Sequence, residues 1–338
     1  MSRNVSIHQL ARPADRLLFA PTRDRYGVRL ALVLGNHAPG GRCPYYAVGK
    51  CLHCDIGAGE GAAITSELNR QRLAWFQEHY RRVLLEVVHL VLYNSGSLLN
   101  PQEMPADLLD EVLAWARSLP ALRIVSVETR EDVVTELSLR RVADALGPNR
   151  TARVILGLET SDDHLREELL AKCMPRTAVK RAVEAISSVA ADLGTERIGL
   201  TFNILVGGPG TTLRTTVDDA LTTAHFALET GRVANIAVDL NLHPYYRSAR
   251  GRSHFPAHPR CSPQTVALVA STIVERVALH VPPTSLFIGI EDEGNDRDLI
   301  PLASRAEVVR DAFAKFNQSQ DASVLNFMCR AEIARETS

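Results

Sequence analysis

Apolar residues in this chain gather in short runs of strand length, separated by longer stretches with helical periodicity. Residues 27–35 form the first run, which is apolar except for Arg29, as is typical of a strand buried on both faces of a parallel sheet. Further strands are predicted over residues 83–93, 122–129, 152–159, 197–206 and 233–242, with a last short one over 285–290. Helices are predicted between them, over residues 61–80, 106–118, 131–145, 162–171, 176–193, 211–230, 263–280 and 303–316.

The regular alternation of strands and helices predicts repeated βα units around one parallel sheet. Six or seven such units in 338 residues fit a barrel better than two domains, because no linker rich in Gly, Ser or Pro divides them. We therefore predict an α/β fold with a partial (β/α)6 TIM-type barrel over residues 26–245. Residues 1–25 would precede it as an N-terminal extension, and residues 246–338 would pack on it as a C-terminal extension that serves the substrate.

The predicted strands end in unusual segments. In (β/α) barrels the chemistry gathers at the C-terminal ends of the strands. Polar and glycine-rich residues follow the strands at that end, over residues 93–97, 128–130, 157–160, 203–210 and 241–245. We expect these segments to line an active site.

Three cysteines follow the first predicted strand in the spacing Cys-x7-Cys-x2-Cys: Cys43, Cys51 and Cys54. Three thiolates on one short loop can hold three irons of a [4Fe-4S] cluster and leave the fourth iron open for a substrate or cofactor. Structural zinc fits less well, because it takes four ligands, usually in two separated pairs, and only His53 lies within the motif. A redox pair of Cys51 and Cys54 would leave Cys43 without a role. Zinc and buried free thiols remain as alternatives.

The cysteine loop does not stand alone. Together with residues 94–97 (Asn-Ser-Gly-Ser), 127–130 (Val-Glu-Thr-Arg) and 157–160 (Gly-Leu-Glu-Thr), it resembles the radical S-adenosylmethionine (radical SAM) superfamily. Within this superfamily the set is similar to the branch that holds the elongator catalytic subunit and the radical subunit of archaeosine synthase. The resemblance covers about residues 25–245. The cysteine spacing departs from the commonest Cys-x3-Cys-x2-Cys, which widens the choice of family but not the chemistry of the cluster.

The resemblance implies an enzyme with two cofactors. Cys43, Cys51 and Cys54 would bind the cluster, and the amine and carboxylate of SAM would chelate the open iron. Reduction by an electron donor such as flavodoxin or ferredoxin would cleave SAM to a 5′-deoxyadenosyl radical, which takes a hydrogen atom from the substrate. The protein would direct the radical and exclude water.

Seven residues at strand ends are the implied SAM contacts: Ser95, Gly96, Ser97, Glu128, Glu159, Asn203 and Gly207. A glycine in the first group lets backbone carbonyls approach the methionine amine. The two glutamates would accept hydrogen bonds from SAM hydroxyls or its amine, and the last two residues match the segment near the ribose and adenine. Taken singly, such a glutamate is as often a cap and a Gly-Gly-Pro is most often a turn, so the regular placement carries the prediction.

The remaining cysteines are Cys173, Cys261 and Cys329, which no local spacing ties together. Three distant thiolates could hold an auxiliary iron-sulfur cluster that donates sulfur to a carbon radical. The alternative is that they are small buried hydrophobic residues.

Charge helps to choose a substrate class. Lys plus Arg total 38 against 39 Asp plus Glu, a net charge of -1, whereas proteins that bind tRNA usually carry a basic surplus. A local basic patch does occur, made of Arg247, Arg250, Arg252, His254, His258 and Arg260, which is either a nucleotide contact or a solvated loop. After the last predicted strand, Glu291 or Asp292 could hold a polar substrate group.

These observations favour a radical SAM enzyme that acts on a nucleoside-like or sugar-like small molecule of a specialised biosynthetic pathway. Sulfur insertion or sulfur-for-oxygen exchange would follow from an auxiliary cluster. The alternatives are a tRNA-modifying enzyme and a non-catalytic metal-binding protein. A cluster and the lack of a secretory leader or apolar membrane span predict a cytoplasmic location without a membrane partner. Serine-hydrolase and nucleotide-hydrolysing classes are disfavoured because neither Gly-x-Ser-x-Gly nor a Walker loop occurs.

Overall fold

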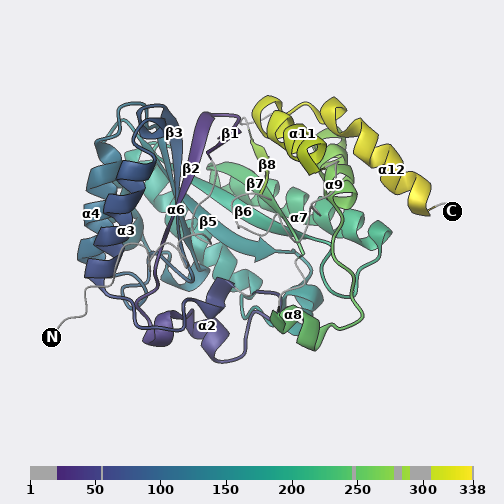
Figure 1. Ribbon diagram of the computed structural model, residues 1–338, viewed down its shortest axis with the longest axis horizontal. Helices are drawn as coiled ribbons and strands as arrows, with labels where there is room; N and C mark the ends of the chain where they lie inside the picture. The colour runs from purple at the N-terminus through teal and green to yellow at the C-terminus, as the bar shows by residue number, and fades with distance from the viewer. Residues whose placement is uncertain (1–20, 55, 246–248, 278–283, 290–305, 337–338) are drawn as a thin grey trace.

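The computed structural model describes residues 21–54, 56–245, 249–277, 284–289 and 306–336 (Figure 1). One sheet of eight strands organises these residues, and its spatial order follows the chain from β1 to β8. β1 pairs with β2 in antiparallel orientation, and all later neighbours are parallel. The strands are β1 (Thr22–Asp24), β2 (Gly27–Leu34), β3 (Val87–Asn94), β4 (Ile124–Thr129), β5 (Thr151–Glu159), β6 (Ile198–Val206), β7 (Ala237–Pro244) and β8 (Leu286–Ile288).

The sheet curls until its two edges meet through side chains. The hydroxyl of Tyr26, in the turn after β1, donates to the Asp239 carboxylate of β7 over 2.9 Å. Arg25 donates to the carbonyl of Thr284, just before β8, over 2.9 Å. The described sheet is therefore a nearly closed (β/α) barrel, in agreement with the predicted fold class.

Helices cover the outside of this barrel (Figure 1). Apolar faces hold them there, and the threonines before α5 and α7 accept hydrogen bonds from the first-turn backbone. The helices are α2 (Pro44–Ala47), α3 (Ser66–His79), α4 (Ala106–Arg117), α5 (Glu136–Leu146), α6 (Arg176–Leu193), α7 (Leu213–Ala234), α8 (Ala249–His254), α9 (Pro263–Arg276), α11 (Ala306–Ser319) and α12 (Asn326–Glu336). None in the described ranges is long and apolar enough to cross a membrane.

Several predicted boundaries are wrong for local reasons. The strand predicted to start at residue 233 starts at Ala237, because α7 continues to Ala234 and ends at Asn235, whose φ is 54°. The helix predicted over 162–171 is a π-helix over His164–Leu169. β8 comes from the region predicted as a C-terminal extension, and β1 lies within the predicted N-terminal extension, so both extensions contribute strands to the barrel sheet.

Layers of side chains fill the barrel interior. The layer near the N-terminal ends of the strands is polar and includes Arg29, His89 and Asp239. Above it lies an apolar layer in which Ala31, Val91 and Ile155 belong to one buried cluster. The C-terminal ends of the strands form the mouth of the barrel beyond this apolar layer.

Candidate active site at the mouth of the barrel

The three cysteines lie on a compact loop between β2 and α3. Cys43 caps α2, and its N–H donates to the carbonyl of Gly57 over 3.0 Å. The N–H of Cys54 donates to the carbonyl of Cys51 over 3.0 Å, and the N–H of Gly57 donates to Cys54 Sγ over 3.4 Å. A β-carbon at Gly57 would lie 3.2 Å from that of Cys43, so the glycine lets the two ends of the loop meet. The spacing of seven residues between Cys43 and Cys51 thus accommodates a short helix.

The cysteines influence one another electrostatically. Burial raises the pKa of Cys54 to about 12 and also raises the pKa of Cys43, and the nearby Cys51 sulfur adds to both shifts. A bound cation would reverse this, because thiolates are the metal-binding form. Across the described residues no three His, Cys, Asp or Glu side chains converge as on a single metal ion. A cubane differs from a single ion in that each thiolate binds a separate iron, so its ligands stand farther apart.

The segment after β5 holds the cysteine loop in place. The N–H of Cys51 donates to the carbonyl of Ala171 over 3.1 Å, and the N–H of Leu52 donates to that of Leu170 over 2.9 Å. Cys51, Ala171 and Cys173 have φ values of 53°, 47° and 53°, a region that residues with side chains rarely adopt. Strained backbone therefore surrounds the loop.

Arg130, which follows β4, joins the same two segments. Its guanidinium donates to the carbonyls of Lys172 over 3.0 Å and Cys173 over 2.9 Å, and to Cys51 Sγ over 3.7 Å. It also lies 3.6 Å from the ring centroid of Tyr45, within α2. Sequence reasoning missed this role, although Arg130 is the last residue of the Val-Glu-Thr-Arg motif.

Glu159 is already paired. The Lys172 ammonium lies 2.5 Å from Glu159 Oε1, and His53 Nε2 lies 3.8 Å from the same oxygen. Burial alone would raise the pKa of Glu159, but the Lys172 charge and the neighbouring His53 ring outweigh it and hold that pKa well below its usual range. The carboxylate is therefore ionised, and its predicted contact with SAM remains a prediction.

A buried carboxylate that the sequence did not indicate supports the loop after β3. Glu103 is 2% exposed and accepts hydrogen bonds from the Asn36 amide over 2.8 Å and the Ser97 N–H over 3.0 Å. A β-carbon at Gly96 would collide with Glu103 Oε2. The glycine therefore makes room for Glu103. Ser95 Oγ donates to the carbonyl of Gly41, 3.3 Å away, at the base of the cysteine loop.

The predicted contacts on β4 and β6 lie at the same end. Glu128 is half-buried, and its carbonyl accepts the N–H of Leu98 over 3.0 Å. Asn203 accepts a hydrogen bond from the amide of Asn241 over 3.2 Å. Gly207, with a φ of 74°, presents its carbonyl to His258 Nε2 over 3.0 Å. All seven predicted SAM contacts thus lie at or just beyond the C-terminal strand ends.

Several buried polar atoms around this mouth have no hydrogen-bond partner within the described structure, among them Asn94 Nδ2, Thr129 Oγ1, Arg130 Nε, Glu131 Oε2 and His53 Nδ1. A buried polar group without a partner costs free energy, so each such group calls for an explanation. A bound polar cofactor would supply one.

α8 meets the cysteine loop from the far end of the chain. Arg250 donates to the carbonyls of Lys50 over 2.7 Å and Tyr46 over 2.9 Å, and it stacks 3.4 Å above the Tyr46 ring. Figure 1 shows α2 and α8 at the same lower edge, opposite β1. Part of the predicted basic patch therefore faces inward. Arg247, Glu291 and Asp292 lie outside the described residues.

The other three cysteines occupy different places. Cys173 adjoins the cysteine loop through Arg130. Cys261 is buried beside Gly207, where a β-carbon would lie 3.2 Å from its sulfur. Cys329 Sγ lies 3.4 Å from Ser271 Oγ, between α12 and α9. The structure does not bring the three together, and the auxiliary cluster remains a prediction.

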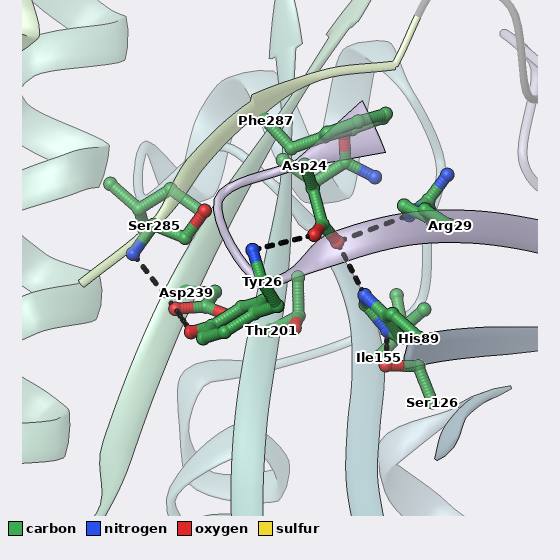
Figure 2. A pocket seen from close by; sticks show the side chains of 12 residues that line it. Asp24, Tyr26, Arg29, His89, Ser126, Ile155, Thr201, Asp239, Ser285 and Phe287 are labelled. Carbon is green, nitrogen blue, oxygen red and sulfur yellow. Dashed lines mark hydrogen bonds and ion pairs between the residues drawn. The ribbon is translucent and has the colours of Figure 1, made fainter. Parts of the chain in front are cut away.

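A second polar cluster, near the N-terminal ends of the strands, escaped sequence reasoning (Figure 2). Asp24 Oδ2 lies 2.6 Å from His89 Nδ1, and His89 Nε2 lies 2.7 Å from Ser126 Oγ. Arg153 is paired with Asp239 beside a cavity of about 20 Å³, which is room for one water molecule. The isolated Arg29 in an apolar run was the sequence signal for this layer.

Comparisons with known proteins give distant matches. No protein-family profile matches the chain. It is 20% identical over 295 residues to the uncharacterized protein MJ0550 of Methanocaldococcus jannaschii, covering 86% of this chain and 77% of that one. Among solved structures, it is similar to the radical S-adenosylmethionine methyltransferase TsrM of Kitasatospora setae (14% identity, 66% of this chain, TM-score 0.40). It is also similar to the archaeal Elp3 of Methanocaldococcus infernus (12% identity, 88% of this chain, TM-score 0.48).

The chain spans 36% of the TsrM chain and 64% of the Elp3 chain. At these identities and scores the similarity says nothing about activity.

Proposed function

We propose that this chain is a radical SAM enzyme in which Cys43, Cys51 and Cys54 hold a [4Fe-4S] cluster at the mouth of the barrel. The observation that carries the proposal is the cysteine loop itself, in which three sulfurs influence one another and two protein segments fix the backbone. Three thiolates fit a cubane with one open iron better than they fit a closed zinc site.

The surroundings of the loop fit such a group. Arg130 and Lys172 place positive charge beside Cys51, which suits an anionic cluster. The partnerless amide nitrogen of Asn94 and hydroxyl of Thr129 lie at the ends of β3 and β4, where SAM would need polar contacts. When bound, the cluster and SAM supply a 5′-deoxyadenosyl radical that abstracts hydrogen from a substrate.

The residues of the chain would bind and orient the cofactors. Ser95 and Ser97 lie in the loop after β3, where Ser95 contacts the start of the cysteine loop. Glu103 stabilises the loop after β3 by accepting the Ser97 N–H. Glu128, Asn203 and the other predicted contacts would hold the ribose and adenine. The ordered mouth would exclude water from the radical.

We propose a small-molecule substrate. The net charge of -1 argues against a polyanionic substrate. In addition, Arg250 and His258 of the predicted basic patch hydrogen-bond backbone carbonyls of the protein. We propose no sulfur transfer, because Cys173 lies beside Arg130 at the cysteine loop whereas Cys329 lies between α9 and α12. Filter binding of bulk tRNA as a function of salt tests the substrate class, and tight binding that weakens steeply with salt would replace it with a nucleic acid.

Anaerobic reconstitution tests the function. Protein loaded with ferrous iron and sulfide should hold about four irons and yield 5′-deoxyadenosine from SAM and dithionite. Cys51→Ala should lose both properties. Cys329→Ala, which removes a cysteine between α9 and α12, is the matched control and should keep both. A colourless wild-type protein, or one that binds zinc instead, would reject the proposal.

A further inference from the structure

Two of the cysteine sulfurs receive hydrogen bonds from different kinds of donor. Cys43 makes no side-chain capping bond to α2, and Cys54 accepts the N–H of Gly57 over 3.4 Å. Cys51 accepts from the guanidinium of Arg130 over 3.7 Å, a normal distance for the large sulfur atom. Backbone donors cannot be removed by substitution, whereas the donor to Cys51 can.

Arg130 is held so that its position is fixed. One guanidinium nitrogen donates to the carbonyls of Lys172 and Cys173, and the same nitrogen lies 3.2 Å from Glu131 Oε1. The face of the guanidinium covers the ring of Tyr45. The planar fork therefore presents its other nitrogen to the sulfur in one geometry.

Arg250 provides a comparison within the same loop. Tyr45 and Tyr46 are consecutive in α2, and each ring is covered by a different arginine. The hydrogen bonds of Arg250 to the loop go to the carbonyls of Lys50 and Tyr46. One arginine thus contacts a ligand sulfur, and the other contacts the backbone between two ligands.

We propose that Arg130 is a positioning residue that raises the reduction potential of the cluster through Cys51, whereas Arg250 only fastens the loop. This inference rests on the proposed function. A reduced cluster carries one more negative charge than an oxidised one, so a buried cation at a ligand sulfur favours reduction. Arg250 should act far less on the potential, because its hydrogen bonds to the loop go to the carbonyls of Lys50 and Tyr46 and not to a ligand sulfur.

Potentiometric titration with dithionite, followed by electron paramagnetic resonance, tests the inference on reconstituted full-length protein. Arg130→Gln should lower the ratio of reduced to oxidised cluster about tenfold at a fixed potential, which is a downward shift of about 59 mV for one electron. Arg130→Lys keeps the charge but loses the fork, so it should shift less. Arg250→Gln should keep the wild-type midpoint and lose iron faster to a chelator.

Each result decides the matter. A wild-type midpoint in Arg130→Gln would overturn the inference while leaving the proposed function intact, and a wild-type protein without a cluster would overturn both. If Arg130→Gln binds no iron, thermal unfolding of the apoprotein is compared with that of Arg250→Gln. An unchanged melting temperature together with iron bound by Arg250→Gln supports the positioning role, and an equal loss of stability and iron in both variants rejects it.

Discussion

The two ends of the barrel interior are both polar, but they are built differently. Near the N-terminal ends of the strands, Asp24 faces His89 and Asp239 faces Arg153, and these residues stand on or beside regular strands. At the mouth, polar groups such as His53, Glu103 and Arg130 stand outside the strands, beside others at the strand ends. Four of the six non-glycine residues with positive φ in the described structure lie there: Cys51, Glu159, Ala171 and Cys173.

The difference separates stability from chemistry. Charges paired inside the sheet need no ligand, whereas the strained backbone of the mouth persists only where the surrounding structure or a function requires it. We therefore expect changes at the lower end to alter the free energy of unfolding and changes at the mouth to alter iron binding.

The largest effect on stability should come from Asp239→Ala. It leaves the Arg153 guanidinium buried without its carboxylate, which should lower the free energy of unfolding by about 3–5 kcal/mol in urea titrations. Arg232→Ala breaks an exposed pair with Glu229 and should leave the free energy of unfolding almost unchanged. Iron bound per folded molecule should stay at the wild-type value. Equal effects of the two substitutions would contradict the contrast.

Gly96→Ala should disrupt the loop after β3 at the mouth of the barrel. Its β-carbon would push Glu103 away from the Ser97 N–H, which should lower the free energy of unfolding by about 1–3 kcal/mol. Iron content after reconstitution should fall more than stability does. Gly208→Ala is the control at the same end of the barrel, because its φ is not positive and a β-carbon there would lie no nearer than 3.4 Å to the side chain of Leu205. Full iron content in Gly96→Ala would show that cluster binding does not depend on the position of Glu103.

The smallest effect concerns pH. Burial lowers the pKa of His89 in the folded protein, although the charge of Asp24 opposes the shift. The His89 imidazole is therefore protonated more readily in the unfolded chain than in the folded one. Stability should therefore fall as pH drops below about 6.5, by at most about 1.4 kcal/mol per pH unit.

His89→Gln should remove that part of the dependence while keeping hydrogen bonds to Asp24 and Ser126. Urea titrations of the wild type and His89→Gln at pH 7.5 and 5.5 measure the change in the free energy of unfolding. An equal loss of stability in the two proteins at pH 5.5 would show that a group other than His89 titrates.

Local signals in the sequence predicted the parallel strands and the cysteine loop. Apolar runs mark buried strands, and a cysteine spacing needs no tertiary information. The short helix α2 was missed although Pro44 after Cys43 is a common helix start. Contacts between distant segments were beyond reach. Arg250 binds Tyr46 across 204 positions, and no local pattern pairs Asp24 with His89 or Lys172 with Glu159.

The seam of the barrel has a consequence for synthesis of the chain. The hydrogen bond from Tyr26 cannot form until Asp239 has left the ribosome, 213 residues later. The hydrogen bond from Arg25 requires Thr284, which is 259 residues later. At translation rates of about 5–20 residues per second, the first of these delays lasts roughly 10–40 s. The hairpin of β1 and β2 therefore emerges long before β7 and β8 exist, and the nascent barrel stays open along one side until translation is nearly complete.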